Sequence, residues 1–281
     1  MPDTNIGTVF DDGAADFERL APSLWNPMGN ALVAAAEITM GESVLDAGCG
    51  TGATTIPAAQ YAGPEARVDG VDLSAEMLAL AQAKASTLAL ENVTLHVGDA
   101  AAWSGGEPYD VVLSAYSIFF LPDMDAGAAH LVSNLSPGGR LALSTWAQGA
   151  LNPFTDLLVQ ECRRERPELA GPLSGARDNS ERLNTPEKLT AWLEGLGLQD
   201  IKVLSTPAQV QLSQSLAWSL VMGSGLRFLL PGDPEAAERV KTAFLAQLGE
   251  EHTLNADTLI ATARRPEFLP CRPIRHAARA E

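Results

Sequence analysis

The stretch at residues 44–52, VLDAGCGTG, constrains the fold of this chain more than any other. Its first two residues end an apolar run that is typical of a buried strand, and Gly48, Gly50 and Gly52 then alternate through a short loop. Residues 53–62 have the composition of a helix. A strand, a glycine loop and a helix place backbone N–H groups at the helix start, where they can face a ligand. Glycine permits positive φ in such a turn and leaves no Cβ to hold a ligand away.

An acidic residue at a fixed distance strengthens this interpretation. Residues 67–72 are predicted to form the next strand, which ends in Asp72, twenty residues after Gly52. In a βαβ unit, an acid at this place is positioned to bind the ribose of a nucleotide. A glycine loop alone, or an acid at a strand end alone, is common without any ligand. The two together at this spacing favour a nucleotide-derived ligand over a purely structural loop.

These residues carry a resemblance to a known family. Asp46-x-Gly48-x-Gly50-x-Gly52, Asp72 and the later Gly98-Asp99-Ala100 resemble the motifs of the class I S-adenosylmethionine (SAM) dependent methyltransferases. Within that family the chain resembles the UbiE-like group, which acts on small molecules. The resemblance covers about residues 40–147 and is weaker towards the C-terminus. It is specific for SAM binding and leaves the methyl acceptor open.

The resemblance implies a role for each motif residue. Asp46 would lie beside the SAM amino group, although it could also cap the loop backbone, and one carboxylate can do both. Asp72 would accept hydrogen bonds from both ribose hydroxyls, and Asp99 would bind the adenine amino group. Leu73 and Met77 would supply apolar contact, and ordinary helix packing explains Met77 equally well. The residues expected at the cofactor are Asp46, Gly48, Gly50, Thr51, Gly52, Asp72, Leu73, Met77, Asp99, Ala100 and Ser114.

The alternation of strands and helices predicts a parallel sheet with helices on both faces. The resemblance implies that the last two strands pair antiparallel at one sheet edge. The expected fold is α/β, a doubly wound and mostly parallel seven-stranded sheet with an antiparallel last strand, plus helical cap insertions. The strands are expected at 43–47, 67–72, 93–98, 109–116, 139–146, 198–204 and 257–264, and helices near 14–20, 27–38, 53–62, 74–90, 124–135 and 185–194.

Two long segments interrupt the pattern. Structureless loops of this length are uncommon in compact domains, so residues 148–184 and 206–255 are expected to form a cap. The second segment contains two predicted helices, at 213–229 and 234–248. The expected organisation is an N-terminal helical cover over 1–40, a SAM-binding core over 41–147, 185–205 and 256–265, cap segments between these, and a tail over 266–281.

The amino-acid composition limits which partners and which cellular compartment are expected. Nineteen basic against thirty-five acidic residues give a net charge of −16, which repels phosphate backbones and argues against a nucleic-acid substrate. The three cysteines form no CxxC pair, so no metal site is expected, and their odd number suits a reducing cytoplasm. The acidic N-terminus lacks the apolar core of a signal peptide, and the longest apolar run, 111–121, is too short to span a bilayer. We therefore expect a cytoplasmic protein without membrane insertion.

The acceptor is expected at the carboxyl ends of the strands, where open α/β sheets bind their ligands. Tyr116 and Trp146 end the fourth and fifth strands, and aromatic rings there could stabilise a sulfonium by about 0.5–2 kcal/mol through cation–π contact. Packing of the cap is the preferred explanation for Met222, pairing with a surface acid the preferred one for Arg227, and an anchoring role explains Trp25 equally well. The residues expected at the acceptor are Trp25, Tyr116, Phe119, Trp146, Trp218, Met222 and Arg227.

The predicted activity is in-line transfer of a methyl group from SAM to O, N or C of a small molecule. Orientation and exclusion of water can supply much of the rate, and no general base is assigned, because His96 and His130 are better explained as structural. Two alternatives stay open. One is a protein of this fold that binds SAM without methyl transfer. The other is an NAD-dependent oxidoreductase, whose fingerprint would have a glycine where this chain has Ala53.

Overall fold

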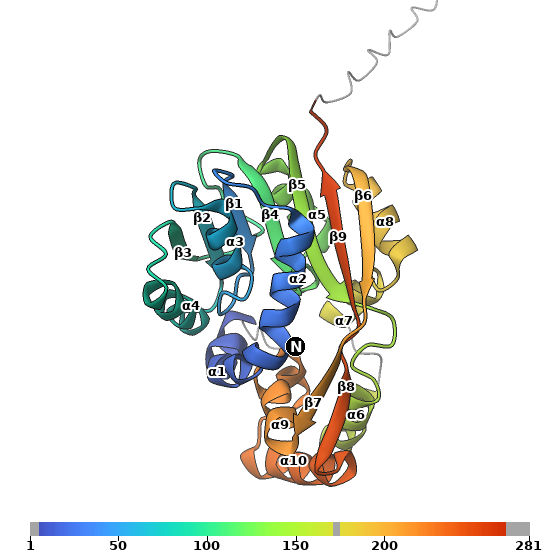
Figure 1. Cartoon of the computed structure of the whole chain (residues 1–281). Coiled ribbons are helices and arrows are strands. Elements are labelled where there is room, and N and C mark those ends of the chain that lie inside the picture. The colour runs from blue at the N-terminus through green and yellow to red at the C-terminus, as the bar shows by residue number, and fades with distance from the viewer. Residues whose placement is uncertain (1–5, 171–174, 268–281) are drawn as a thin grey trace, which may run out of the picture.

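Seven strands form the main sheet of the computed structural model, which describes residues 6–170 and 175–267 (Figure 1). Their order is β3-β2-β1-β4-β5-β9-β6. Neighbours among the first five strands pair parallel, and β9 pairs antiparallel with both β5 and β6. This confirms the predicted fold class. The strands are β1 (Val44–Ala47), β2 (Val68–Asp72), β3 (Val93–Val97), β4 (Tyr109–Ala115), β5 (Leu135–Trp146), β6 (Gln199–Thr206) and β9 (Thr258–Arg264).

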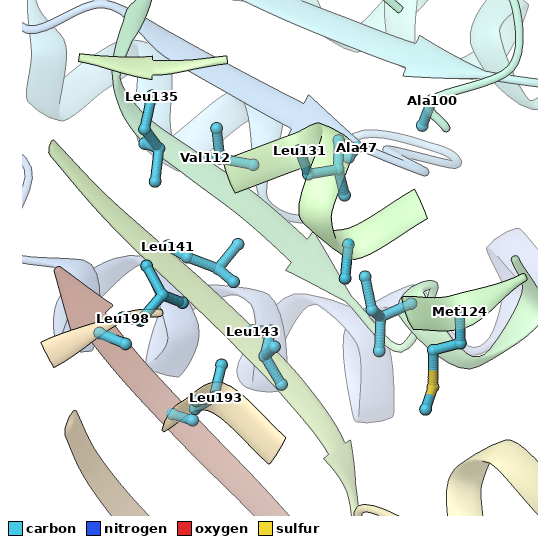
Figure 2. Packing of buried hydrophobic residues seen from close by; sticks show 14 of the residues in the cluster. Ala47, Ala100, Val112, Met124, Leu131, Leu135, Leu141, Leu143, Leu193 and Leu198 are labelled. Carbon is cyan, nitrogen blue, oxygen red and sulfur yellow. The ribbon is translucent and has the colours of Figure 1, made fainter. Parts of the chain in front are cut away.

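Helices cover both faces of this sheet because consecutive strand residues point to opposite sides. Val111 and Leu113 of β4 pack with α2 (Asn26–Ala36) and α3 (Thr55–Ala62) on one face. Val112, between them, packs on the other face with α5 (Met124–Ser133) and α8 (Pro186–Gly195). Figure 2 shows this second face, where Leu141 and Leu143 lie near Leu193 of α8. α4 (Ala75–Thr87) lies against β2 and β3.

A second unit covers the ends of the strands in Figure 1 and has a buried core of its own. This unit contains two short strands, β7 (Gln209–Ser213) and β8 (Glu251–Asn255), which pair antiparallel. β7 comes shortly after β6 in the chain, and β8 comes shortly before β9. The Ala256 N–H donates to the Ala208 carbonyl at 2.8 Å, so the ribbon continues across the junction. The helices of this unit are α6 (Phe154–Glu165), η3 (Pro167–Ala170), α9 (Gln214–Met222), η4 (Gly225–Leu229) and α10 (Pro234–Leu248), whereas α7 (Ala176–Glu181) packs on the main unit at η2 (Ile118–Phe120).

The structure corrects several expected elements. The segment 206–255, expected to be helical, also contains β7 and β8. The helix expected over 213–229 breaks into α9 and η4 at Gly223, where a side chain would come within 2.3 Å of the Phe17 N–H nitrogen. β5 begins at Leu135 rather than at 139, and its pairing with β4 shifts register there. The tail expected over 266–281 lies outside the described residues from 268 onwards.

The N-terminal segment is more helical than expected and lies between the two units. α1 (Ile6–Arg19) replaces the helix expected over 14–20 and leads into a short turn of π-helix, η1 (Ala21–Trp25). α1 contacts α4 of the core and α9 of the cap. In the described part of the chain no helix has both the length and the apolarity to cross a bilayer.

Candidate active site

A cavity of about 1840 Å³ lies where the carboxyl ends of the parallel strands meet α1 and the cap. Such a volume exceeds what one small ligand needs, so the cavity has room for two. The residues predicted at the cofactor and those predicted at the acceptor all line this cavity, except Asp46 and Gly52. The lining includes Gly48, Gly50, Thr51, Asp72, Leu73, Met77, Asp99, Ala100 and Ser114 from the first group, and Trp25, Tyr116, Phe119, Trp146, Trp218, Met222 and Arg227 from the second.

The glycine loop has the backbone conformation that the sequence predicts. Gly48, Gly50 and Gly52 have φ of +73°, +51° and +85°, which side chains rarely adopt. Lack of space also requires glycine at position 48, because a Cβ there would lie 2.4 Å from the Cβ of Ser117. Gly52 does not line the cavity, and a Cβ there would meet Ala81 of α4 at 3.2 Å. The third glycine therefore serves the packing of the loop on α4.

Asp72 fastens the loop to the end of β2. One of its carboxylate oxygens accepts a hydrogen bond from the Gly50 N–H at 2.8 Å, and the other accepts from the Ser74 N–H at 2.9 Å. Burial raises the pKa of Asp72, and these two backbone donors act against that rise. Each carboxylate oxygen has a second lone pair, so Asp72 can still accept hydrogen bonds from a pair of ribose hydroxyls.

Asp46 is fully buried directly before the loop. Its Oδ2 accepts hydrogen bonds from the hydroxyls of Thr54 and Thr55 at 2.5 and 2.6 Å, while its Oδ1 accepts none from any described residue. Burial raises the pKa of Asp46 to about 6. An unpartnered carboxylate oxygen is costly in a buried place, and a ligand cation would relieve that cost. The residues present therefore fit a group with an amino cation and a ribose, such as SAM.

Lys84 and Asp11, which the sequence did not single out, dock α1 on this loop. The Lys84 ammonium donates to the Thr51 carbonyl at 2.8 Å and pairs with Glu18 of α1 at 2.7 Å. Asp11, also on α1, accepts from the Ser74 hydroxyl at 2.7 Å. The two contacts to α1 join residues more than sixty positions apart, so no local pattern could have predicted them.

The remaining cofactor candidates occupy the rim of the cavity. The Asp99 carboxylate accepts from the Ala101 N–H at 2.9 Å and is otherwise exposed. Leu73 is 42 % exposed, although it is apolar, whereas Met77 is buried beside the glycine loop. Ser114 shares a hydrogen bond of 2.7 Å with Ser117, whose hydroxyl donates to the Ala47 carbonyl.

Four aromatic side chains form a wall at the ends of β4 and β5. The rings of Tyr116 and Trp146 lie 4.3 Å apart, and Trp25 lies 5.9 Å from Tyr116 and 6.3 Å from Trp146. Phe17 of α1 stacks on Trp25 at 4.5 Å. Trp25 is 6 % exposed and packs in the core of the cap, so it both anchors η1 and lines the cavity.

Tyr116 contributes its ring rather than its hydroxyl to the cavity. The Thr258 hydroxyl donates to the Ala256 carbonyl at 2.9 Å, so the Tyr116 hydroxyl, 2.6 Å away, must donate to Thr258. Burial raises the pKa of Tyr116 well above its usual value. The residue also has φ of +51°, an unusual conformation for a side chain of this size, which costs roughly 1–3 kcal/mol and is typical of functional sites.

The other acceptor candidates take different places in the wall. Phe119 is buried in the main core and touches the cavity at its edge. Trp218 and Met222 line the cavity from α9, and the Lys241 ammonium lies 5.8 Å from the Trp218 ring. Arg227 forms an ion pair of 3.3 Å with Asp12 of α1.

No histidine lines the cavity among the described residues. His96 pairs with Asp69 at 3.0 Å, and His130 is bound to the Trp103 carbonyl at 2.6 Å. His252 packs beside Phe154 in the cap. His276 lies outside the described residues. The cavity thus provides no imidazole base.

Comparison with known proteins decides the family. A profile of the methyltransferase domain matches residues 44–139. The aklanonic acid methyltransferase DauC of Streptomyces sp. strain C5 is 36 % identical over 201 residues, which cover 68 % of this chain and 90 % of DauC. The chain belongs to the class I SAM-dependent methyltransferases. Its cofactor is SAM, and it is an enzyme of the transferase class.

Other relatives agree with this assignment. The nocamycin O-methyltransferase of Saccharothrix syringae is 32 % identical over 154 residues, covering 51 % of this chain and 55 % of that protein. Two solved structures share the fold at low identity. YcgJ of Bacillus subtilis has a TM-score of 0.57 at 17 % identity, covering 86 % of this methyltransferase and 99 % of YcgJ. A phosphoethanolamine N-methyltransferase of Haemonchus contortus in complex with SAM has a TM-score of 0.55 at 21 % identity. The match covers 91 % of this chain and 57 % of that protein.

Proposed function

We propose that this methyltransferase transfers the methyl group of SAM to an oxygen atom of a small, largely apolar, ring-containing acceptor. The aromatic wall of Tyr116, Trp146 and Trp25 carries this proposal, because it lies in the same cavity as the glycine loop. Flat rings pack well against aromatic side chains, with about 0.5–1.5 kcal/mol per pair beyond the area they bury. The name of one relative, the nocamycin O-methyltransferase, supports an oxygen acceptor.

The cofactor side of the site works by orientation. SAM supplies a methyl group on a sulfonium, which is already a strong electrophile. We assign the ribose to Asp72, with Asp99 and Ala100 at the adenine and Leu73 and Met77 as apolar contacts. Asp46 does not line the cavity, so we assign it to the amino group through its charge rather than through a contact. The chain would then hold the methyl group in one place, and holding reactants in line lowers the barrier substantially.

The acceptor side works by shape and by exclusion of water. The rings of Tyr116 and Trp146 can face both the acceptor and the sulfonium charge, which cation–π contact stabilises by about 0.5–2 kcal/mol. The Tyr116 proton is committed to Thr258, so Tyr116 does not act as an acid. Because no histidine lines the cavity among the described residues, we propose that the acceptor oxygen arrives ionised or loses its proton to water.

An acceptor screen with labelled SAM tests this proposal. The panel would contain naphthols, naphthoic acids, an aliphatic acid and an aromatic amine, with the labelled product identified by mass spectrometry. We expect label on the oxygen of ring compounds and none on the amine. Transfer to the amine alone, or binding of SAM without turnover of any compound, would contradict the proposal. Asp72→Ala serves as a control, since it should remove turnover of every acceptor together.

A further inference from the structure

Large apolar side chains that stay exposed mark one place in the cap. In the described part of the chain seven such side chains are exposed, and only Leu73 and Phe228 among them line the cavity. Leu73 lies at the cofactor end and already has a proposed partner in the adenosine. Phe228 is 38 % exposed at the cap end and has no such partner. Its position in the cavity points to a ligand that covers it.

The short helix η4, which carries Phe228, presents an apolar surface to the same cavity. None of its residues is buried, and Leu226, Leu229 and the following Leu230 line the cavity with Phe228. Its charged residue, Arg227, is neutralised by Asp12 of α1. The surface offered to a ligand is therefore neutral and apolar. Solvent-exposed apolar patches inside a cavity are typical of ligand-binding sites.

Arginines fix the backbone of η4 on both sides of Phe228. The Arg166 guanidinium donates to the Phe228 carbonyl at 2.8 Å and to the Leu230 carbonyl at 3.1 Å, and it pairs with Glu168 at 2.8 Å. Arg227 donates to the Met222 carbonyl at 3.4 Å. Leu226 and Leu229 are half-buried against the cap core, and charged donors hold the backbone, so η4 has a fixed shape while Phe228 stays exposed. A fixed shape is what selection among ligands needs.

The beginning of η4 packs on the aromatic side of the cavity. A Cβ at Gly225 would lie 2.9 Å from the Phe120 ring, so only glycine allows this approach. Phe120 in turn lies 5.5 Å from Phe10 of α1 and 4.9 Å from Phe119. The apolar surface of η4 therefore continues into aromatic side chains of α1 and of the segment after β4, within one cavity.

We infer that Phe228 is an acceptor-binding residue that selects acceptors by the size of their apolar body, and that Arg166 is the positioning residue for it. This inference rests on the proposed function and names the substrate class more closely. The acceptor would have an apolar body long enough to reach from the reacting oxygen near Tyr116 to η4. A single small ring would leave Phe228 uncovered.

A binding experiment tests the inference without methyl transfer. The probe is 1-anilinonaphthalene-8-sulfonate, a naphthalene dye with an attached phenyl ring, bound to the full chain saturated with S-adenosylhomocysteine. We expect Phe228→Ala to raise the Kd of the dye about tenfold, the effect of losing a contacting phenyl ring. Leu204→Ala is the matched control, since Leu204 is 57 % exposed on β6 and does not line the cavity. An unchanged Kd in Phe228→Ala would overturn the inference.

Kinetics with a screened acceptor give a second, separate test. Phe228→Ala should raise KM for a three-ring acceptor and leave kcat within about twofold, while a one-ring acceptor keeps its KM. Arg166→Met should raise KM in the same way, and Arg166→Lys should recover part of it. A structural defect would instead lower the Tm and weaken the binding of S-adenosylhomocysteine. We expect both the Tm and this binding to stay unchanged. Equal KM values for Phe228→Ala and wild type would overturn the inference.

The two proposals fail in different ways. If no acceptor turns over but dye binding depends on Phe228, the proposed function is wrong and the apolar ligand site stands. If oxygen acceptors turn over and neither dye nor acceptor responds to Phe228, the proposed function stands and the inference is wrong.

Discussion

The two ends of the cavity recognise ligands by different means. At the cofactor end, the carboxylate of Asp72 has fixed partners on the backbone of Gly50 and Ser74, and these groups come from one short stretch of sequence. At the acceptor end, rings from Trp25, Trp146 and other distant segments meet without hydrogen bonds between their side chains. A ligand that never changes can be bound by polar groups of fixed geometry. On the function we propose, an acceptor that differs between relatives would be bound by apolar shape, which many sequences can provide.

The largest effect that would sharpen this comparison is expected at the glycine loop. Gly50→Val places a β-branched residue at φ of +51°, which costs roughly 1–2 kcal/mol and turns the Gly50 N–H away from Asp72. We expect SAM binding to fall below detection by calorimetry. The added Cβ has room, with Met77 Sδ at 3.6 Å, so the effect arises from the backbone rather than from a clash.

Gly41→Val is the matched control for this strain. Gly41 has φ of +88°, has open space around it and does not line the cavity. It should lower the Tm as Gly50→Val does and leave the Kd for SAM unchanged. If both variants bind SAM like wild type, the loop does not hold the cofactor.

The next largest effect is expected for Asp72→Ala. The change removes the acceptor of the Gly50 and Ser74 N–H groups together with the proposed ribose contact. A hydrogen bond to a charged group contributes about 1.5–3 kcal/mol, so SAM affinity should fall roughly ten- to a hundredfold. Asp72→Asn, which keeps one oxygen acceptor, should lose less. Calorimetry that gives the same Kd for all three proteins would remove Asp72 from the ribose.

A smaller and selective effect is expected at the aromatic wall. Trp146→Ala removes the ring that lies 4.3 Å from Tyr116, so kcat/KM for a screened acceptor should fall about tenfold while the Kd for S-adenosylhomocysteine, which has no sulfonium charge, stays within twofold. Tyr116→Phe keeps the ring and loses only the hydrogen bond to Thr258, so it should retain acceptor turnover. A parallel loss of S-adenosylhomocysteine affinity in Trp146→Ala would contradict the division of the cavity into two ends.

The smallest effect is expected in the pH dependence of stability, which should differ between the core and the cap. Burial raises the pKa of Asp46 to about 6, so the folded core binds its proton more tightly than the unfolded chain and loses stability as pH rises through 6. Burial lowers the pKa of His252, so the unfolded cap binds protons more tightly and the cap loses stability as pH falls below about 6.5.

Hydrogen exchange of the SAM-free protein at pH 7.5 and 5.5 measures this difference. After correction for intrinsic rates, β8 and α6 should exchange faster at pH 5.5, and β1 should not. His252→Gln should remove the response of the cap. An equal response of core and cap would show that the two regions do not open separately.

The sequence predicted the core well because its signals are local. The glycine positions and the acid at the end of β2 are local signals, and so are the N-cap residues Ser74 and Thr185, whose hydroxyls accept backbone hydrogen bonds from residues three positions on. The cap was predicted less well. β7 alternates polar and apolar residues as a strand does, but it has only five residues, and its partner β8 lies about forty residues further along the chain, so the pairing cannot be predicted from β7 alone.

The same distinction explains which site residues were missed. Lys84 and Asp11 depend on partners in other helices, and Arg166 acts on carbonyl groups sixty residues away. The break before η4 comes from contact between Gly223 and α1. Contacts of this kind leave no mark on a single sequence. The aromatic residues could be predicted because strand ends in such a sheet open on the ligand site.

The place of β9 in the sheet has a consequence for folding order. β9 is the last strand of the described residues, yet it lies between β5 and β6, and the whole β7-to-β8 segment must be synthesised before it. Until β9 inserts, the edge of β5 has no neighbour and β6 has no partner in the sheet. The final step of folding thus closes a long loop, which is slow because contacts distant in sequence must form together. A chain stalled before residue 258 would carry a complete glycine loop and an open, aggregation-prone strand edge.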